Sequence, residues 1–322
     1  MTETQVRKVL SSLEGKTFDQ LYFVACGGSS ALMYPGKYFA DCHSKRINTD
    51  FYNSNEFIYL SPAALGEKSL VITCSQEGKT PETVAAAKYA KSKGATVIAL
   101  AMQEGTPLQQ SSDYFVLYGH YKTCPMIETS YGVVYMLTAG IIEQQEKKPL
   151  FEGMVKNLNK ATPVVKGAVE QFRKMAEDFA KACKDAKVLY SLASGPDYSQ
   201  SYVFSNCYMM EMQWINAIPI HAGEFFHGPF EIIEENSPVI LLMGRSNSRY
   251  LEERALAFCK KYTHELYVID TKEVDFKDID EAYHGVIAVL VLNNVCRLFS
   301  ETIAVARNHP LDIRRYMHLV EY

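Results

Sequence analysis

Residues 69–83 read SLVITCSQEGKTPET, and this stretch decides the fold class. Its first part, Ser69 to Thr73, is an apolar run typical of strands that are buried on both faces. A polar loop follows, and a helical pattern then runs from Pro81 to Lys93, where Gly94 supplies the stop. We expect the next strand at Thr96 to Ala101. This succession predicts a parallel α/β sheet.

The same design recurs along the chain. Leu21 to Ala25 is another apolar strand, and it leads through CGGSS into a helix expected from Ala31 to His43. A weaker repeat, at an offset of 168 residues, places Leu21 against Leu189 and Val71 against Val239. We therefore expect two doubly wound, mostly parallel α/β domains. The predicted divisions are residues 1–150, residues 151–322, a helical connector over 150–186 and a last helix near 283–308.

Composition excludes several classes of protein. The 322 residues are 48% hydrophobic and 22% charged, which is ordinary for a globular chain and excludes a disordered one. The net charge of −4 argues against a protein that grips nucleic acid or an anionic membrane by bulk charge. The eight cysteines are scattered without a CxxC pair, and no signal sequence or membrane span stands out. We expect a cytoplasmic protein.

The loop SQEGKT, residues 75–80, is the most informative local segment. It precedes a helix N-terminus, where unpaired N–H groups and the helix dipole favour an anion. The hydroxyls of Ser75, Thr80 and Thr83 add donors, and without a cationic cluster the loop suits a sugar monophosphate. A Walker A motif is excluded, because that motif needs glycine at the position of Thr73. The alternative is that Ser75 and Thr80 only cap the helix.

A second polar turn, Cys26-Gly27-Gly28-Ser29-Ser30, follows the strand that ends at Ala25. Ligands of open α/β sheets bind outside the carboxyl ends of the strands. The glycines let the backbone approach a ligand, and Ser29 can donate to a phosphate oxygen. The turn lacks the GxGxxG spacing of dinucleotide sites. Two hydroxyl-rich loops at equivalent strand ends together favour a phosphosugar site.

Residues 203–218 are apolar on nearly every side and predict a buried helix in which Glu211 is the only charge. A lone buried carboxylate is costly unless it is paired or protonated, so we expect a raised pKa for Glu211. A general acid or base that works near neutral pH has this profile. The alternative is a structural glutamate bound to a buried arginine or to backbone N–H groups.

His227 lies in GEFFHGPF, between paired phenylalanines and a Gly-Pro break. A histidine in such an apolar setting is commonly a hydrogen-bonded core residue, which is the alternative to a catalytic role. The segment is not a zinc-binding HExxH motif, because Gly223 stands where the first histidine is required. We expect no metal site.

At these residues the sequence resembles the sugar isomerase (SIS) domain family, whose members bind phosphosugars with a CGxS turn and an S-x-x-G-x-T loop. Residues 26–29 and 75–80 match the two motifs, and the resemblance covers nearly the whole chain as two tandem SIS domains. The chain is similar to the isomerase half of glucosamine-6-phosphate synthase. It shows no N-terminal glutaminase domain, and it has His318 where the synthase has a catalytic lysine. Glu77 replaces a phosphate-binding serine.

The strings EMQWI, GEFFHGPFEI and the terminal RRYM-x-x-VEY look like the fructosamine-6-phosphate deglycase branch, in particular the 6-phosphofructose-aspartate deglycases of fructose-asparagine use. In that branch the acid/base glutamate and histidine lie sixteen residues apart, as Glu211 and His227 do here. The resemblance to the synthase implies a homodimer with shared active sites, in which the histidine comes from the neighbouring subunit.

The resemblance implies hydrolysis of a 6-phosphofructosyl amino acid, expected to be 6-phosphofructose-aspartate, to glucose 6-phosphate and the free amino acid. Proton transfer between adjacent carbons needs a positioned acid and base, and neither a metal nor an organic cofactor. We assign the carbon proton transfers to Glu211 and ring opening or acid assistance to His227, with Glu224 and His318 as further candidates. The expected phosphate ligands are Ser29, Ser75, Gln76, Thr80 and Thr83.

Other functions stay open. They are a fructoselysine or glucoselysine 6-phosphate deglycase, a phosphosugar aldose–ketose isomerase and a non-catalytic phosphosugar-binding regulator. The second half has no hydroxyl-rich loop like SQEGKT, since its equivalent edge reads PVILLMGRSNSR over residues 238–249, so we expect one phosphate site per chain. Arg245 and Arg249 there could meet a substrate carboxylate or could simply be solvated.

Overall fold

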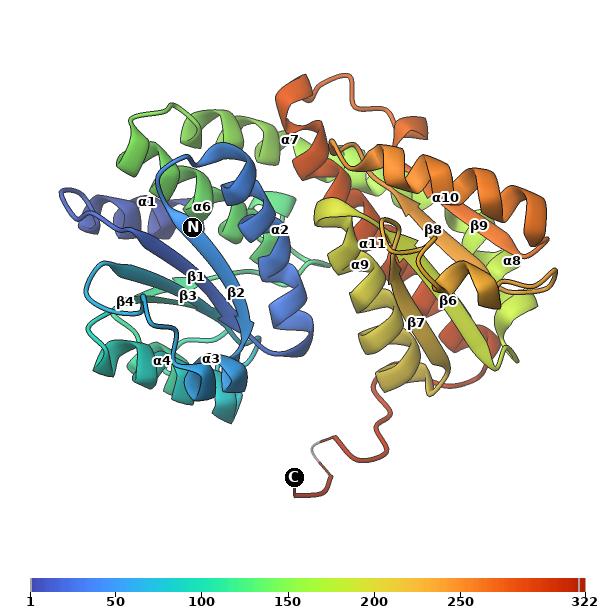
Figure 1. Cartoon of the computed structure of the whole chain (residues 1–322), viewed down its shortest axis with the longest axis horizontal. Coiled ribbons are helices and arrows are strands. Elements are labelled where there is room, and N and C mark those ends of the chain that lie inside the picture. The colour runs from blue at the N-terminus through green and yellow to red at the C-terminus, as the bar shows by residue number, and fades with distance from the viewer. Residues whose placement is uncertain (1, 318, 322) are drawn as a thin grey trace. The chain divides into compact units, whose positions relative to one another are not determined.

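The computed structural model describes residues 2–317 and 319–321, and the chain divides into two compact units, Met1–Thr162 and Pro163–Tyr322 (Figure 1). The division falls inside helix α7 (Phe151–Gln171). The boundary expected from the sequence, between residues 150 and 151, lies at the start of that helix.

The first unit is built on a parallel sheet with the strand order β2-β1-β3-β4-β5. Figure 1 shows α3 and α4 together on one face of this sheet and α1, α2 and α6 on the other. The strands are β1 (Gln20–Ala25), β2 (Asn48–Asn53), β3 (Ser69–Cys74), β4 (Thr96–Ala101) and β5 (Tyr114–Leu117). The helices are α1 (Thr2–Ser12), α2 (Gly27–His43), α3 (Ser54–Leu60), α4 (Pro81–Ser92), α5 (Pro107–Gln110), η1 (Met126–Glu128) and α6 (Ser130–Glu146).

The strands predicted from apolar runs are confirmed as β1, β3 and β4. Their residues are apolar because helices cover both faces of the sheet at these strands. Every residue of β3 is buried. The helix expected after β1 begins earlier than predicted, at Gly27, directly after the strand. Strand β2 was not predicted from its sequence NTDFYN, because it is an edge strand with partly exposed, mostly polar residues.

The second unit repeats the topology with the order β7-β6-β8-β9. The predicted repeat is confirmed, since Leu189 lies in β6 and Val239 begins β8. The strands are β6 (Val188–Ala193), β7 (Asn216–His221), β8 (Val239–Met243) and β9 (Leu266–Asp270). The helices are α8 (Arg173–Cys183), η2 (Gly195–Asp197), α9 (Tyr198–Tyr202), η3 (Val203–Met212), η4 (Pro229–Ile232), α10 (Arg249–Tyr262), η5 (Thr271–Glu273), η6 (Glu281–Tyr283) and α11 (His284–Ala306).

The helix predicted over residues 203–218 is wrong in its last third. It ends at Met212 as the π-helix η3, and strand β7 follows from Asn216. Trp214 makes the turn between them with a positive φ of 56°. An apolar run does not by itself distinguish a buried helix from a buried strand, which explains the error.

Helix α11 forms the core of the second unit. Among the described residues, the segment Glu281–Ala306 is long and apolar enough to cross a membrane by length and composition, contrary to the expectation that no stretch approaches a span. In the structure 72% of its most apolar window is buried. Helix α11 packs against α8 and η3, so its apolar surface serves the interior of the unit.

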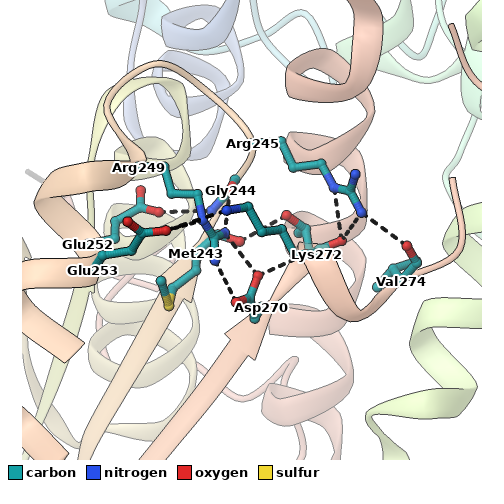
Figure 2. Close-up of polar contacts among 10 residues, drawn as sticks. Met243, Gly244, Arg245, Arg249, Glu252, Glu253, Asp270, Lys272 and Val274 are labelled. Atoms are coloured by element: carbon teal, nitrogen blue, oxygen red, sulfur yellow. Dashed lines mark hydrogen bonds and ion pairs between the residues drawn. The ribbon is translucent and has the colours of Figure 1, made fainter. Parts of the chain in front are cut away.

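The carboxyl edge of the second sheet is filled by a side chain of the chain itself. Glu252, from α10, accepts the backbone N–H of Ser194 at 3.1 Å. It also accepts the backbone N–H of Gly244 at 3.0 Å (Figure 2). These N–H groups belong to the loops after β6 and β8. The Ser194 hydroxyl donates to the same carboxylate at 2.8 Å. An internal carboxylate thus takes the donors that an external anion would need.

The guanidinium groups of Arg245 and Arg249, at this edge, bind acceptors within the same unit. Arg249 binds the carboxylates of Asp270 at 2.6 Å and Glu253 at 2.9 Å. Arg245 donates to the backbone carbonyl of Thr271 at 2.8 Å and to that of Val274 at 3.2 Å; Figure 2 labels Arg245 and Val274. Neither guanidinium is simply solvated, because burial of each is compensated by acceptors from the β9 end of the sheet. The expectation that they are free for a substrate carboxylate is therefore not supported.

Asp197 is an unsatisfied carboxyl beside this cluster. It is fully buried, and neither of its oxygens has a hydrogen-bond partner within the described residues. Burial raises the pKa of Asp197 well above 3.8, and the charge of Glu252 raises it further. Burial also raises the pKa of Glu252, to about 7, although hydrogen bonds from Ser194 and Gly244 oppose the rise. The folded unit therefore retains protons that the unfolded chain releases.

Replacing Asp197 by asparagine should stabilise the protein, and more so as pH rises. Above a pH of about 4, ionisation of Asp197 stabilises the unfolded wild-type chain, whereas the folded chain keeps Asp197 protonated. The wild type therefore loses stability relative to Asp197→Asn as pH rises. We expect the unfolding free energy of Asp197→Asn to exceed that of the wild type by more at pH 8 than at pH 5. Urea titrations at the two pH values measure this difference.

The matched control is Asp178→Asn, which removes an exposed carboxylate from α8. It should give no difference that grows with pH. A difference for Asp197→Asn that shrinks or reverses between pH 5 and pH 8 would contradict the assignment of a buried, protonated carboxyl.

Candidate active site

The carboxyl ends of β1 and β3 form a candidate ligand site of the first unit. These strands are parallel neighbours in register, with Ala25 opposite Cys74. Their following loops, from Cys26 and from Ser75, therefore start side by side. The chain leaves β1 and β3 toward opposite ends of the sheet, toward β2 and β4 respectively, so the loops flank the topological switch point. Open α/β sheets bind their ligands at this point.

Helix α2 presents an uncapped N-terminus to this edge. Its N-cap residue, Cys26, makes no side-chain capping bond, and Gly27 and Gly28 are exposed. Gly27 has a φ of 54°, which favours glycine. The first N–H groups of the helix are thus open to an anion. Ser29, in the first turn, is partly buried with its hydroxyl against the thiol of Cys74.

The SQEGKT loop is held by its own hydroxyls. Ser75 Oγ lies 2.9 Å from Thr80 Oγ1, and Gly78 N–H donates to the Ser75 carbonyl at 3.0 Å. A Cβ at Gly78 would lie 2.4 Å from Thr106 Oγ1, and its φ is 65°, so glycine is required there. Thr80 is the N-cap of α4 but makes no side-chain capping bond. Thr80 is therefore not a conventional side-chain cap, whereas Ser75 Oγ accepts the backbone N–H of Thr80 at 3.4 Å.

The remaining predicted phosphate ligands differ in access. Gln76 is exposed at the start of the loop, whereas the hydroxyl of Thr83 is buried and lies 3.0 Å from Ser54 Oγ. The structure thus gathers Ser29, Ser75, Gln76 and Thr80 at one sheet edge, and it uses the Thr83 side chain to join α4 to α3.

Cys74, beneath the two loops, is not a reactive thiol. It is fully buried at the end of β3, and burial raises its pKa to about 12 despite hydrogen bonds with Tyr118 and Ser29. A thiol in this state carries no nucleophilic thiolate near neutral pH. The polar chemistry of this edge therefore comes from hydroxyl and N–H groups.

Glu211 lies in the last turn of η3, in the second unit. Its Oε1 pairs with Nη2 of Arg314 at 2.8 Å, and its side chain is 25% exposed. The expected lone buried carboxylate is therefore a partly exposed carboxylate with a cationic partner. A π-helix is rare and frequently marks a functional site, because it displaces the side chains that follow it.

An open pocket of about 450 Å³ borders Glu211. Trp214 and Met210 line it from one side, and Arg314 and Arg315 line it from the other. The guanidinium of Arg315 lies 4.3 Å from the centre of the Trp214 ring, a cation–π contact. The resemblance includes these arginines in the string RRYM but assigns them no role, because nothing in residues 314–317 indicates that they fold back to η3.

His227 lies in the loop after β7, where Phe225 anchors the chain in the core. Phe225 is fully buried, whereas His227 and Glu224 are exposed. The backbone N–H of His227 donates to the Glu224 carbonyl at 2.9 Å, which closes a tight turn. The alternative of a core histidine is therefore wrong. Neither His227 nor Glu224 lines the pocket of Glu211, and His318 lies outside the described residues.

Comparisons with known proteins identify the family of the chain. Residues 18–123 match the SIS domain model. The chain is 48% identical to the fructosamine deglycase FrlB of Bacillus subtilis, over 99% of this chain and 97% of the relative. It is 26% identical to the fructoselysine 6-phosphate deglycase of Escherichia coli, over 98% of this chain and 91% of the relative.

A solved structure from Bacillus subtilis, provisionally described as a phosphosugar isomerase, matches with a TM-score of 0.98. It is 48% identical and is aligned over 99% of this chain and 97% of that chain. The agreement extends over both α/β units, including the second, which the SIS domain model does not reach. The chain therefore belongs to the SIS domain family, as two tandem SIS domains of the fructosamine deglycase branch.

Proposed function

We propose that this protein is a fructosamine-6-phosphate deglycase that hydrolyses 6-phosphofructosyl amino acids to glucose 6-phosphate and the free amino acid. The observation that carries the proposal is the 48% identity to a fructosamine deglycase along 99% of the chain. The uncapped helix ends beside Ser75 and Thr80 support a phosphate site, and Glu211 at an open pocket supports proton transfer.

In this proposal the phosphate lies at the switch point of the first sheet. The N–H groups at the start of α2 and the hydroxyls of Ser29, Ser75 and Thr80 donate to its oxygens, together with the amide of Gln76. Thr83 contributes through its backbone N–H, because its hydroxyl is bonded to Ser54. Binding energy from this remote group positions the reacting carbons and lowers the barrier there.

The chemistry at the other end of the substrate needs one base and one acid. After the sugar ring opens, Glu211 takes a proton from C1. The electron pair of the C1–H bond forms the C1–C2 double bond of an enaminol, while the π pair of the C2 carbonyl moves onto its oxygen, which takes a proton from the acid. Return of a proton to C2 gives the Schiff base of the aldose. Water then adds to C1, and the C1–N bond breaks to release the amino acid. The sum is one water consumed and one C–N bond hydrolysed.

His227 would open the ring from the neighbouring subunit of a homodimer, with Glu224 beside it. Its exposure, and its absence from the Glu211 pocket of its own chain, support this assignment. His318 remains a candidate at the chain end. A cytoplasmic location belongs to the same proposal, because all eight cysteines are unpaired, as expected in a reducing compartment.

The amino-acid part of the substrate is proposed to be aspartate. A fructoselysine 6-phosphate deglycase is the nearest alternative, since a relative of that name is 26% identical. An aldose–ketose isomerase would use the same glutamate but release no amino acid. Glucose 6-phosphate and free amino acid formed together from one substrate distinguish the deglycase from both the isomerase and a binding regulator.

Replacing Glu211 by glutamine should abolish turnover while leaving the substrate bound. The amide keeps the shape of the side chain but cannot accept a proton from carbon, so we expect kcat to fall about 10²- to 10⁴-fold with a small change in KM. A coupled assay of glucose 6-phosphate release from 6-phosphofructose-aspartate measures both constants.

Glu177→Gln is the control for this variant, because Glu177 is an exposed carboxylate of α8 away from the pocket. It should keep the wild-type kcat. If Glu211→Gln retained wild-type turnover, Glu211 would have no part in the chemistry and another base would be needed.

Removing the hydroxyl of Ser75 should weaken binding of the phosphate. Loss of one hydrogen bond to a charged group is worth about 1.5–3 kcal/mol, so Ser75→Ala should lower kcat/KM about 10- to 100-fold, mainly through KM. Ser92→Ala, at the far end of α4, is the matched control and should behave as the wild type. An unchanged KM for Ser75→Ala would remove this loop from the phosphate site.

A further inference from the structure

Arg314 is held so that one side of its guanidinium faces Glu211. Its Nη1 donates to the backbone carbonyls of Leu311 at 2.7 Å and Ile313 at 3.1 Å. Its Nη2 lies 2.8 Å from Glu211 Oε1, and the side chain is only 19% exposed. The tail backbone thus fixes the guanidinium and leaves Nη2 as the group that binds a carboxylate.

This ion pair opposes the role proposed for Glu211. A guanidinium at hydrogen-bond distance stabilises a carboxylate as the anion, and this makes it a poorer acceptor of a proton from carbon. For Glu211 to act as a base, Arg314 must find a different partner in the substrate complex.

The pocket offers room and charge for such a partner. Arg314 and Arg315 both line it, against the single carboxylate of Glu211, so its described lining carries a net positive charge. Arg315 is exposed and lies over the Trp214 ring, and the volume is about 450 Å³. A planar guanidinium fork matches a carboxylate in geometry, which makes an organic acid a suitable occupant.

The proposed substrate carries a carboxylate near this position. In the adduct of an α-amino acid, the α-carboxyl carbon is three bonds from C1 of the sugar, through the nitrogen and Cα. The phosphate is attached beyond C6, at the other end of the sugar. The anion closest to the carbon that Glu211 must reach is therefore the α-carboxylate of the amino acid.

We propose that Arg314 is the residue that recognises the amino-acid part of the substrate: the α-carboxylate replaces Glu211 on Nη2 of Arg314 and thereby releases Glu211 for proton transfer. This inference rests on the proposed deglycase function. Recognition and activation are then one event, since a substrate without the carboxylate leaves Glu211 in its ion pair.

The experiment compares two substrates that differ only in the carboxylate, 6-phosphofructosyl-glycine and 6-phosphofructosyl-methylamine. The wild type should favour the glycine adduct about 10- to 100-fold in kcat/KM, with a difference in kcat as well as in KM. In Arg314→Gln the rate with the glycine adduct should fall, whereas the methylamine adduct, which has no carboxylate to bind Arg314, should show no comparable loss. The ratio of the two substrates should approach 1.

Three further variants separate recognition from structure. Arg314→Lys keeps the charge without the fork and should give an intermediate ratio. Arg173→Gln, which removes an exposed arginine of α8, should keep the wild-type ratio. Arg315→Gln tests the neighbouring arginine, and a ratio that collapses there but not in Arg314→Gln would overturn the assignment to Arg314.

Two results would overturn the inference while leaving the deglycase intact. One is equal turnover of both substrates by the wild type, and the other is an equal loss on both in Arg314→Gln, which indicates a merely structural ion pair. If the wild type releases no glucose 6-phosphate from the glycine or the aspartate adduct, the proposed function itself fails and the inference fails with it.

Discussion

The parallel pairing of β1 with β3 is the constraint on which the candidate ligand site of the first unit depends. Register places Ala25 opposite Cys74, so the loops that follow must begin next to each other. Each loop then runs into a helix whose N-terminus lacks a side-chain cap. The first N–H groups of a helix have no partner within the helix, and they need a hydrogen-bond acceptor from a side chain, water or a ligand. Here the geometry favours an anion, and the hydroxyls of Ser75 and Thr80 surround the same edge.

The second sheet has the same topology and treats its edge in the opposite way. Glu252 accepts the N–H groups of Ser194 and Gly244, so the equivalent site is occupied from within. This arrangement buries two carboxyl groups, Glu252 and Asp197, close together, and burial raises the pKa of each. The duplicated fold thereby divides its tasks. In the first unit the helices at the sheet edge have no side-chain cap, and the second unit carries Glu211 on a π-helix.

Much of this arrangement could be predicted from the sequence, because buried parallel strands and glycine-rich loops have strong local patterns. The strands β1, β3 and β4, the internal repeat and the loops around Ser29 and Ser75 all follow from such patterns. Edge strand β2 and the end of η3 could not be predicted, since tertiary pairing decides them. The partnership of Glu211 with Arg314 joins residues about one hundred positions apart, and no local pattern indicates it.

The central claim is that this protein hydrolyses the C1–N bond of a phosphorylated Amadori compound. The most direct test is to identify the products by NMR after incubation of the purified protein with 6-phosphofructose-aspartate. The account predicts glucose 6-phosphate and free aspartate in equal amounts, formed at the same rate. Formation of fructose 6-phosphate, or of an isomerised adduct that keeps its amino acid, would contradict it.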